Sequence, residues 1–143
     1  MAATKSEFSA GGVVLRGGDV AVIVPTRRGA KGERVLALPK GHPEAEETPV
    51  EAARREVEEE TGLDVELLGD LGEVGYWYQR KGRRIAKRVV FFLFEFRSGS
   101  LEDHDHEIEE ARWMPLEEAR SALSYAGERE MVERAIAARA DDR

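Results

Sequence analysis

Residues 41–63 read GHPEAEETPVEAARREVEEETGL, and this stretch is the most informative part of the chain. Thr48 suits the N-cap of a helix, Pro49 suits the first helical position, and a glutamate three residues after Thr48 completes a capping box. Gly62 is a natural stop, because glycine readily adopts the left-handed conformation that ends many helices. The spacing therefore predicts a helix over residues 49–61.

This predicted helix has two distinct faces at about 100° per residue. One carries Val50, Ala53, Val57 and Thr61 and is expected to pack on a sheet. The other gathers three carboxylates, on Glu56, Glu59 and Glu60. Like charges at these spacings repel one another, and the helix dipole disfavours anions near its C-terminus. A divalent cation would remove the conflict, and hard oxygen ligands suit Mg²⁺ or Mn²⁺. The helix alone leaves open a merely solvated charged face.

The whole segment resembles the Nudix box, G-x5-E-x7-R-E-U-x-E-E-x-G-U, in which U is a bulky aliphatic residue. The fixed positions all agree: Gly41, Glu47, Arg55, Glu56, Val57, Glu59, Glu60, Gly62 and Leu63. So many spaced positions are far more specific than a short glycine motif. The chain is therefore similar to Nudix hydrolases of the MutT type, and the resemblance extends to residues 113–115 and the last predicted helix.

The resemblance implies an α/β fold, an α/β/α sandwich with a mixed β-sheet between helices. We expect a flexible N-terminus at residues 1–6 and a single domain at residues 7–140. Sequence patterns predict strands at 8–15, 20–24, 35–38, 65–68, 74–78, 85–96 and 111–114, and further helices at 115–123 and 127–138. Residues 89–94 are apolar on both faces, which places them in mid-sheet with cover on each side.

By position in the box, the resemblance implies a metal site. Its ligands would be Glu56, Glu59 and Glu60, with the carbonyl of Lys40 or Gly41 as a further ligand. Arg55 and Glu47 match the pair that braces the loop against the helix. Arg55 and Glu56 also count among the catalytic candidates.

The reaction that the resemblance implies is hydrolysis of a nucleoside diphosphate linked to a second group. Bound metals would neutralise phosphate oxygens and lower the pKa of an attacking water, whose proton a carboxylate takes. Two candidates for this base stay open. Glu59 lies inside the box, and Glu107 lies outside it in a polar loop, six residues before Trp113.

Two further segments suggest the substrate. Residues 38–42, LPKGH, resemble dinucleoside polyphosphate hydrolases and also diphosphoinositol polyphosphate hydrolases, and they make Lys40 a substrate-binding candidate. Residues 124–129, SYAGER, resemble the same branch, in which an aromatic residue lies against the base. Tyr125 is the candidate for stacking on adenine, although it could equally anchor the helix in the core.

A basic segment, residues 80–88, also suits a highly charged substrate. Strand alternation places Lys87 on the face of Val89 and Phe91, where the resemblance implies contact with phosphates. Arg84 belongs to a predicted hairpin tip that either attracts phosphates or merely keeps the sheet edge soluble. Trp77 is a candidate for a second stacking surface.

Composition limits the remaining choices. The chain has 143 residues, no cysteine and a net charge of −7, which excludes disulfides and thiol nucleophiles and disfavours stable nucleic-acid binding. No apolar run is long enough for a membrane span. We expect a cytoplasmic monomer or homodimer that hydrolyses a dinucleoside polyphosphate such as diadenosine tetraphosphate. The alternatives are an oxidised nucleoside triphosphate, a diphosphoinositol polyphosphate, or a nucleotide sensor without turnover.

Overall fold

The computed structural model describes residues 5–141, and its centre is a six-stranded mixed sheet. The strands are β1 (Lys5–Arg16), β2 (Asp19–Pro25), β3 (Lys40–Gly41), β4 (Leu63–Arg80), β5 (Arg83–Gly99) and β6 (Ile108–Pro115). They run in the order β4-β5-β1-β2-β6, with the short β3 paired to β1. Strands β1 and β5 are parallel, and the other pairings are antiparallel.

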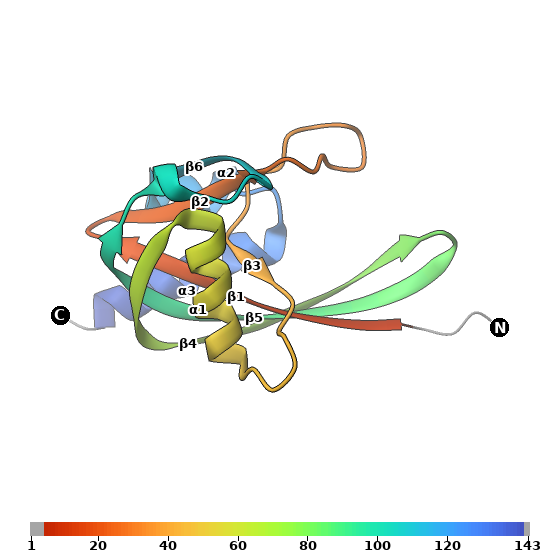
Figure 1. Cartoon of the computed structure of the whole chain (residues 1–143), viewed down its shortest axis with the longest axis horizontal. Helices are drawn as coiled ribbons and strands as arrows, with labels where there is room; N and C mark the ends of the chain where they lie inside the picture. Colours follow the sequence, from red (N-terminus) through yellow and green to blue (C-terminus); the bar gives the residue numbers. More distant parts are fainter. Residues whose placement is uncertain (1–4, 142–143) are drawn as a thin grey trace.

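Helices cover both faces of this sheet. Helix α1 (Pro49–Thr61) buries Ala53 and Val57 against Val14 and Phe94 on one face. Helices α2 (Leu116–Ala122) and α3 (Ala126–Asp141) pack on the other face, where Met131 belongs to the larger core cluster. Figure 1 shows α1 in front of the sheet and α3 behind it. The predicted α/β/α sandwich is confirmed.

Helix α1 has the boundaries that its sequence predicts. The Thr48 hydroxyl accepts a hydrogen bond from the Glu51 N–H at 3.3 Å, and the Glu51 carboxylate accepts one from the Thr48 N–H at 2.9 Å. Gly62 ends the helix in the left-handed conformation, with φ of 76°. Both ends of the carboxylate-bearing helix are therefore fixed by local hydrogen bonding.

The predicted strand at residues 35–38 is wrong. This segment makes an isolated bridge between Ala37 and Ile23, and the paired strand comes later, at β3. Two of its amide groups bond to side chains instead of to a neighbouring strand. The Leu36 N–H donates to the Ser124 hydroxyl at 2.9 Å, and the Leu38 N–H donates to the Glu128 carboxylate at 2.7 Å. Val35, Ala37 and Leu38 are still buried, which explains why the pattern resembles a strand.

The two strands predicted at 65–68 and 74–78 form one long strand, β4. Its pairing with β5 shifts register at three places, between Asp64 and Val65, between Leu67 and Gly69, and between Asp70 and Gly72. Such irregularities change which face each side chain occupies, and this hides the continuity of the strand from a two-residue pattern. The far end of the β4–β5 hairpin extends beyond the body of the sandwich (Figure 1).

Strand β5 lies inside the sheet, as its apolar sequence predicts. Val89, Phe91 and Leu93 belong to the core under α2 and α3, whereas Phe94 belongs to the core under α1. Residues 1–4 of the predicted flexible N-terminus lie outside the described part, and β1 begins at Lys5. None of the helices in residues 5–141 is both long and apolar enough to span a membrane.

Candidate active site

The loop before α1 lies directly against the carboxylates of the helix. A Cβ atom placed on Gly41 would lie 1.3 Å from Oε2 of Glu56, so no larger residue fits there without moving that carboxylate. The N–H of Lys40 donates to Oε1 of Glu60 at 2.9 Å. Strand β3 holds both loop residues, because Gly41 pairs with Ala10 and Lys40 with Gly11 of β1.

Arg55 connects this loop to the helix. Its guanidinium donates to both carboxylate oxygens of Glu47, at 2.8 and 3.0 Å, and to the carbonyl of His42 at 3.0 Å. The hydrogen bonds from Arg55 lower the pKa of Glu47 to about 2. This bidentate pair is the brace that the sequence predicts between loop and helix.

The same guanidinium also contacts two carboxylates of the predicted metal site. Its Nη1 atom lies 3.3 Å from Oε1 of Glu56 and 3.2 Å from Oε2 of Glu59. Arg55 precedes Glu59 by one helical turn, so this contact is an i,i+4 ion pair. Arg55 therefore partly offsets the repulsion among the glutamates.

Two of the three glutamates are poorly solvated. Burial raises the pKa of Glu56 to about 8, and the neighbouring Glu59 and Glu60 carboxylates add to this increase. Burial likewise raises the pKa of Glu60 to about 7, although the N–H of Lys40 acts in the opposite direction. An ionised carboxylate in such a setting needs a cationic partner.

The residues present fit a hard dication. Within residues 5–141, no three histidine or acidic side chains already converge as a metal cage. Glu56 and Glu59 instead turn to Arg55, and Glu60 turns to the loop amide. The candidate metal ligands are all carboxylate oxygens, and they lie on adjacent turns of one helix. The absence of a side chain at Gly41 lets Glu56 lie against the loop. This oxygen-only set suits Mg²⁺ or Mn²⁺.

Three adjoining pockets meet at Lys40. The first, of about 180 Å³, contains Gly41, Glu60, Arg27 and Lys87. The second, of about 420 Å³, is polar and shares Arg27 and Lys87 with it. The third, of about 240 Å³, is mainly apolar and extends under α3. The pocket lined by Glu60 thus adjoins a cation-lined pocket and an apolar one.

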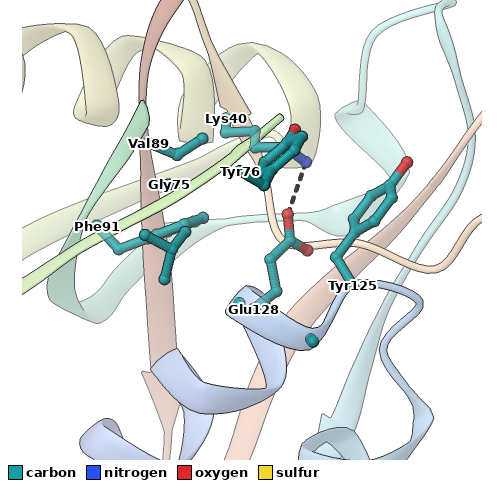
Figure 2. Close-up of a pocket in the computed structure, with 10 residues that line it drawn as sticks. Lys40, Gly75, Tyr76, Val89, Phe91, Tyr125 and Glu128 are labelled. Carbon is teal, nitrogen blue, oxygen red and sulfur yellow. Dashed lines mark ion pairs between the residues drawn. The ribbon is translucent and has the colours of Figure 1, made fainter. Parts of the chain in front are cut away.

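Two tyrosines flank the apolar pocket. Tyr76, from β4, and Tyr125, from the segment before α3, both line it, and Figure 2 shows them near the paired Lys40 and Glu128 side chains. Val89 and Phe91 belong to the wall that the sheet contributes. This combination of aromatic walls with a few polar groups is typical of a site for a flat organic ligand.

The NUDIX domain family matches residues 6–135 of the chain. The chain belongs to the Nudix family. A Mycobacterium tuberculosis protein named mutator protein MutT4 is 42% identical over 136 residues, which cover 91% of this chain and 54% of that protein. An 8-oxo-(d)GTP phosphatase of Mycolicibacterium smegmatis is 32% identical over 70% of this chain and 30% of its own length. The asymmetrical bis(5'-nucleosyl)-tetraphosphatase of Mus musculus is 35% identical over 57% of this chain and 56% of its own length. The chain thus spans about half the length of these curated relatives, or less.

Solved structures of Nudix proteins share the fold. A NUDIX hydrolase from Nitrosomonas europaea superposes with a TM-score of 0.76 at 22% identity, over 94% of this chain and 90% of that one. A binary complex of the C. elegans Ap4A hydrolase gives a TM-score of 0.68 at 22% identity, over 94% of this chain and 98% of that one. At this level of identity the likeness concerns the fold.

The Nudix fold brings several predicted substrate-binding residues to the pockets. Lys87 lines the two polar pockets beside Lys40, where burial and the charge of Lys40 lower its pKa. Tyr125 faces the apolar pocket and also packs against the core cluster of Ile23 and Val35. Both of the roles considered for Tyr125 are therefore compatible with its position.

Trp77 and Arg84 are not brought to these pockets. Trp77 alternates along β4 with Tyr76 and Tyr78, which line the polar pocket, so its ring lies on the other face of the hairpin. There the guanidinium of Arg84 stacks 4.0 Å from the centroid of the Trp77 ring. Neither residue lines the three pockets at Lys40, and their substrate-binding roles stay predictions.

The loop that carries Glu107 lies against the last turn of α1. The N–H of Asp105 donates to the carbonyl of Glu59 at 2.9 Å, and the carbonyl of Glu107 accepts from the N–H of Thr26 at 3.0 Å. Glu107 itself is exposed. Its role as a base remains a prediction, as does that of Glu59.

Sequence reasoning did not single out three residues that line these pockets. Arg27 lines two pockets but lies in a loop whose sequence has no distinctive pattern. Tyr76 was only one of three adjacent aromatic residues. Glu128 is buried and bonds to Leu38, 90 positions away, a distance over which sequence patterns carry no signal.

Proposed function

We propose that this chain is a metal-dependent hydrolase of a phosphoanhydride bond in a nucleoside diphosphate-linked substrate, and that the substrate is a dinucleoside polyphosphate such as diadenosine tetraphosphate. The observation that carries the proposal is the meeting of three environments at Lys40. They are the carboxylates of α1, a cation-lined pocket and a pocket between two tyrosines. A nucleotide with a long phosphate chain needs all three.

In this proposal, Glu56, Glu59, Glu60 and the Gly41 carbonyl hold Mg²⁺ or Mn²⁺. When bound, the metal neutralises phosphate oxygens and lowers the pKa of a water molecule. Arg55 holds the loop against the helix through its hydrogen bonds to Glu47 and His42. Glu59 accepts the proton of the attacking water, with Glu107 as the second candidate.

The pocket walls support the proposed substrate. Arg27, Arg80 and Lys87 line the polar pocket, and cationic side chains there would bind successive phosphates. Tyr76 and Tyr125 flank a cavity of about 240 Å³, in which a nucleobase would stack. A monomer or homodimer in the cytoplasm that acts on a small molecule belongs to the same proposal.

Hydrolysis of an oxidised nucleoside triphosphate is a second candidate, since relatives carry the names mutator protein and 8-oxo-(d)GTP phosphatase. Hydrolysis of a diphosphoinositol polyphosphate is a third candidate, and nucleotide sensing without turnover is a fourth. The tyrosine-flanked pocket disfavours an inositol substrate, which has no aromatic ring to stack.

A product assay separates these candidates. The protein is incubated with Mg²⁺ and diadenosine tetraphosphate, 8-oxo-dGTP or a diphosphoinositol polyphosphate, and the products are resolved by chromatography. We expect mononucleotide products from the first compound. Preferred cleavage of another compound would reassign the substrate, and tight binding with no cleavage of any would indicate a sensor.

Replacing Lys87 with alanine tests the phosphate-binding role of this side chain. We expect the KM for diadenosine tetraphosphate to rise roughly 10-fold, since a charge-assisted hydrogen bond is lost. The KM for a substrate with a shorter phosphate chain should rise less. Steady-state kinetics on both substrates measure the difference.

Lys81→Ala is the matched control, because it removes the same charge from the exposed hairpin tip. It should leave both KM values unchanged. An equal loss on both chain lengths in Lys87→Ala would point to packing, and an equal effect of Lys81→Ala would point to long-range attraction.

A further inference from the structure

The main chain and the side chain of Lys40 bind to two different helices. Its N–H donates to Glu60 on α1 at 2.9 Å, and its ammonium group lies 2.8 Å from Oε2 of Glu128 on α3. The residue thus joins the helix of the candidate metal ligands to the helix on the other face of the sheet. It also directly precedes Gly41, against which the Glu56 carboxylate lies.

Glu128 is buried where it pairs with Lys40. It is 3% exposed, and the side chain of Lys40 is 11% exposed, so their ion pair is almost entirely shielded from water. The second carboxylate oxygen of Glu128 accepts the N–H of Leu38 at 2.7 Å. One carboxylate therefore binds two positions of the segment that leads into the metal loop. Figure 2 shows this carboxylate extending from α3 toward Lys40.

The same segment is fixed from its other sides. The N–H of Gly12 donates to the carbonyl of Pro39 at 3.1 Å. A Cβ on Gly11 would lie 2.7 Å from that of Lys40, which shows how closely β1 approaches. Strand β1 and α1 hold the segment by main-chain contacts and by Glu60, and α3 holds it through Glu128. A buried charged pair is costly to form unless both partners are held in place, so it defines one position for Lys40.

We propose that Glu128 is a positioning residue for the metal centre. Glu128 holds the ammonium group of Lys40 against α3, so that the Lys40 N–H stays on Glu60 and Gly41 stays against the Glu56 carboxylate. The inference rests on the proposed function, because it assumes that a dication binds there. It assigns a role in the α1 site to a residue that lies outside residues 41–63.

The test is Mn²⁺ binding to the substrate-free protein, measured by electron paramagnetic resonance of the unbound ion. Glu128→Gln keeps the volume and the bond to Leu38 but removes the charge that holds Lys40. We expect Mn²⁺ to bind roughly 10-fold more weakly, the lower end of the loss seen when outer-shell partners of metal ligands are changed. We also expect kcat to fall alike for every substrate that the wild-type chain cleaves.

Ser124→Ala is the matched control. It removes a side-chain bond from the same region to the Leu36 N–H but does not touch Lys40, so Mn²⁺ binding should not change. If Glu128→Gln is unfolded at the assay temperature, Glu128→Asp makes the same comparison, since it retracts the charge by one methylene group.

The outcomes are distinct. Unchanged Mn²⁺ affinity in a folded Glu128 variant overturns the inference and leaves the proposed function intact. If only KM changed, and by an amount that depends on the nucleobase of the substrate, Glu128 would contact the substrate instead. Absence of Mn²⁺ binding by the wild-type chain would overturn the proposed function itself.

Discussion

Glu59→Gln is expected to lower kcat by about 10²–10⁴-fold, the range that a positioned general base contributes. The amide has nearly the same shape but neither accepts the proton of the attacking water nor adds charge to the metal site. Because Glu59 is exposed and its carboxylate accepts hydrogen bonds from the side chain of Arg55, which glutamine can also accept, the fold should be retained. Single-turnover kinetics and circular dichroism measure the two effects.

Glu58→Gln is the control for this variant. Glu58 carries the same charge one position earlier on α1 and is also exposed, but it is not among the box glutamates. Its turnover should match the wild-type value. Wild-type turnover in Glu59→Gln would remove Glu59 from the mechanism, and a large loss in Glu107→Gln would then identify the base outside the box.

Gly41→Ala is expected to reduce kcat by at least about 10²-fold, because displacement of a catalytic group by about 1 Å can have that effect. The added methyl group would lie 1.3 Å from Oε2 of Glu56, so the carboxylate must move. Gly41 is not among the glycines with positive φ, so alanine can adopt its backbone conformation. The loss should therefore appear in turnover much more than in the thermal unfolding temperature.

Gly69→Ala is the matched control, since a Cβ there meets nothing within 4 Å and the position also has no positive φ. It should leave both activity and unfolding temperature unchanged. If Gly41→Ala retained wild-type kcat, the close approach of Glu56 to the loop would have no part in catalysis.

The parts of the structure that sequence predicted are those in which neighbouring residues interact. The capping box at Thr48, the stop at Gly62 and the placement of three glutamates on one helical face depend on spacings of three or four residues. The position of β5 inside the sheet followed in the same way from the unbroken apolar run at residues 89–94. The family resemblance supplied the order of the layers.

Local sequence patterns carried less information where distant segments meet. Residues 35–38 have the apolar pattern of a strand, but Ser124 and Glu128 take up two of its amide hydrogens. Trp77 and Tyr76 are adjacent in sequence, and the register shifts of β4 decide which of them faces the pockets. The ion pair between Lys40 and Glu128 joins a loop to a helix that lies across the sheet, and no local spacing indicates it.

Calorimetric titration of Mn²⁺ or Mg²⁺ into the substrate-free protein tests most directly whether the crowded glutamates of α1 form a dication site. We predict saturable binding to the wild-type chain below millimolar concentration. The variant with Glu56, Glu59 and Glu60 all replaced by glutamine should stay folded but show no binding heat. A wild-type chain that bound neither ion at millimolar concentration, or a triple variant that bound them equally well, would contradict a dication site on α1.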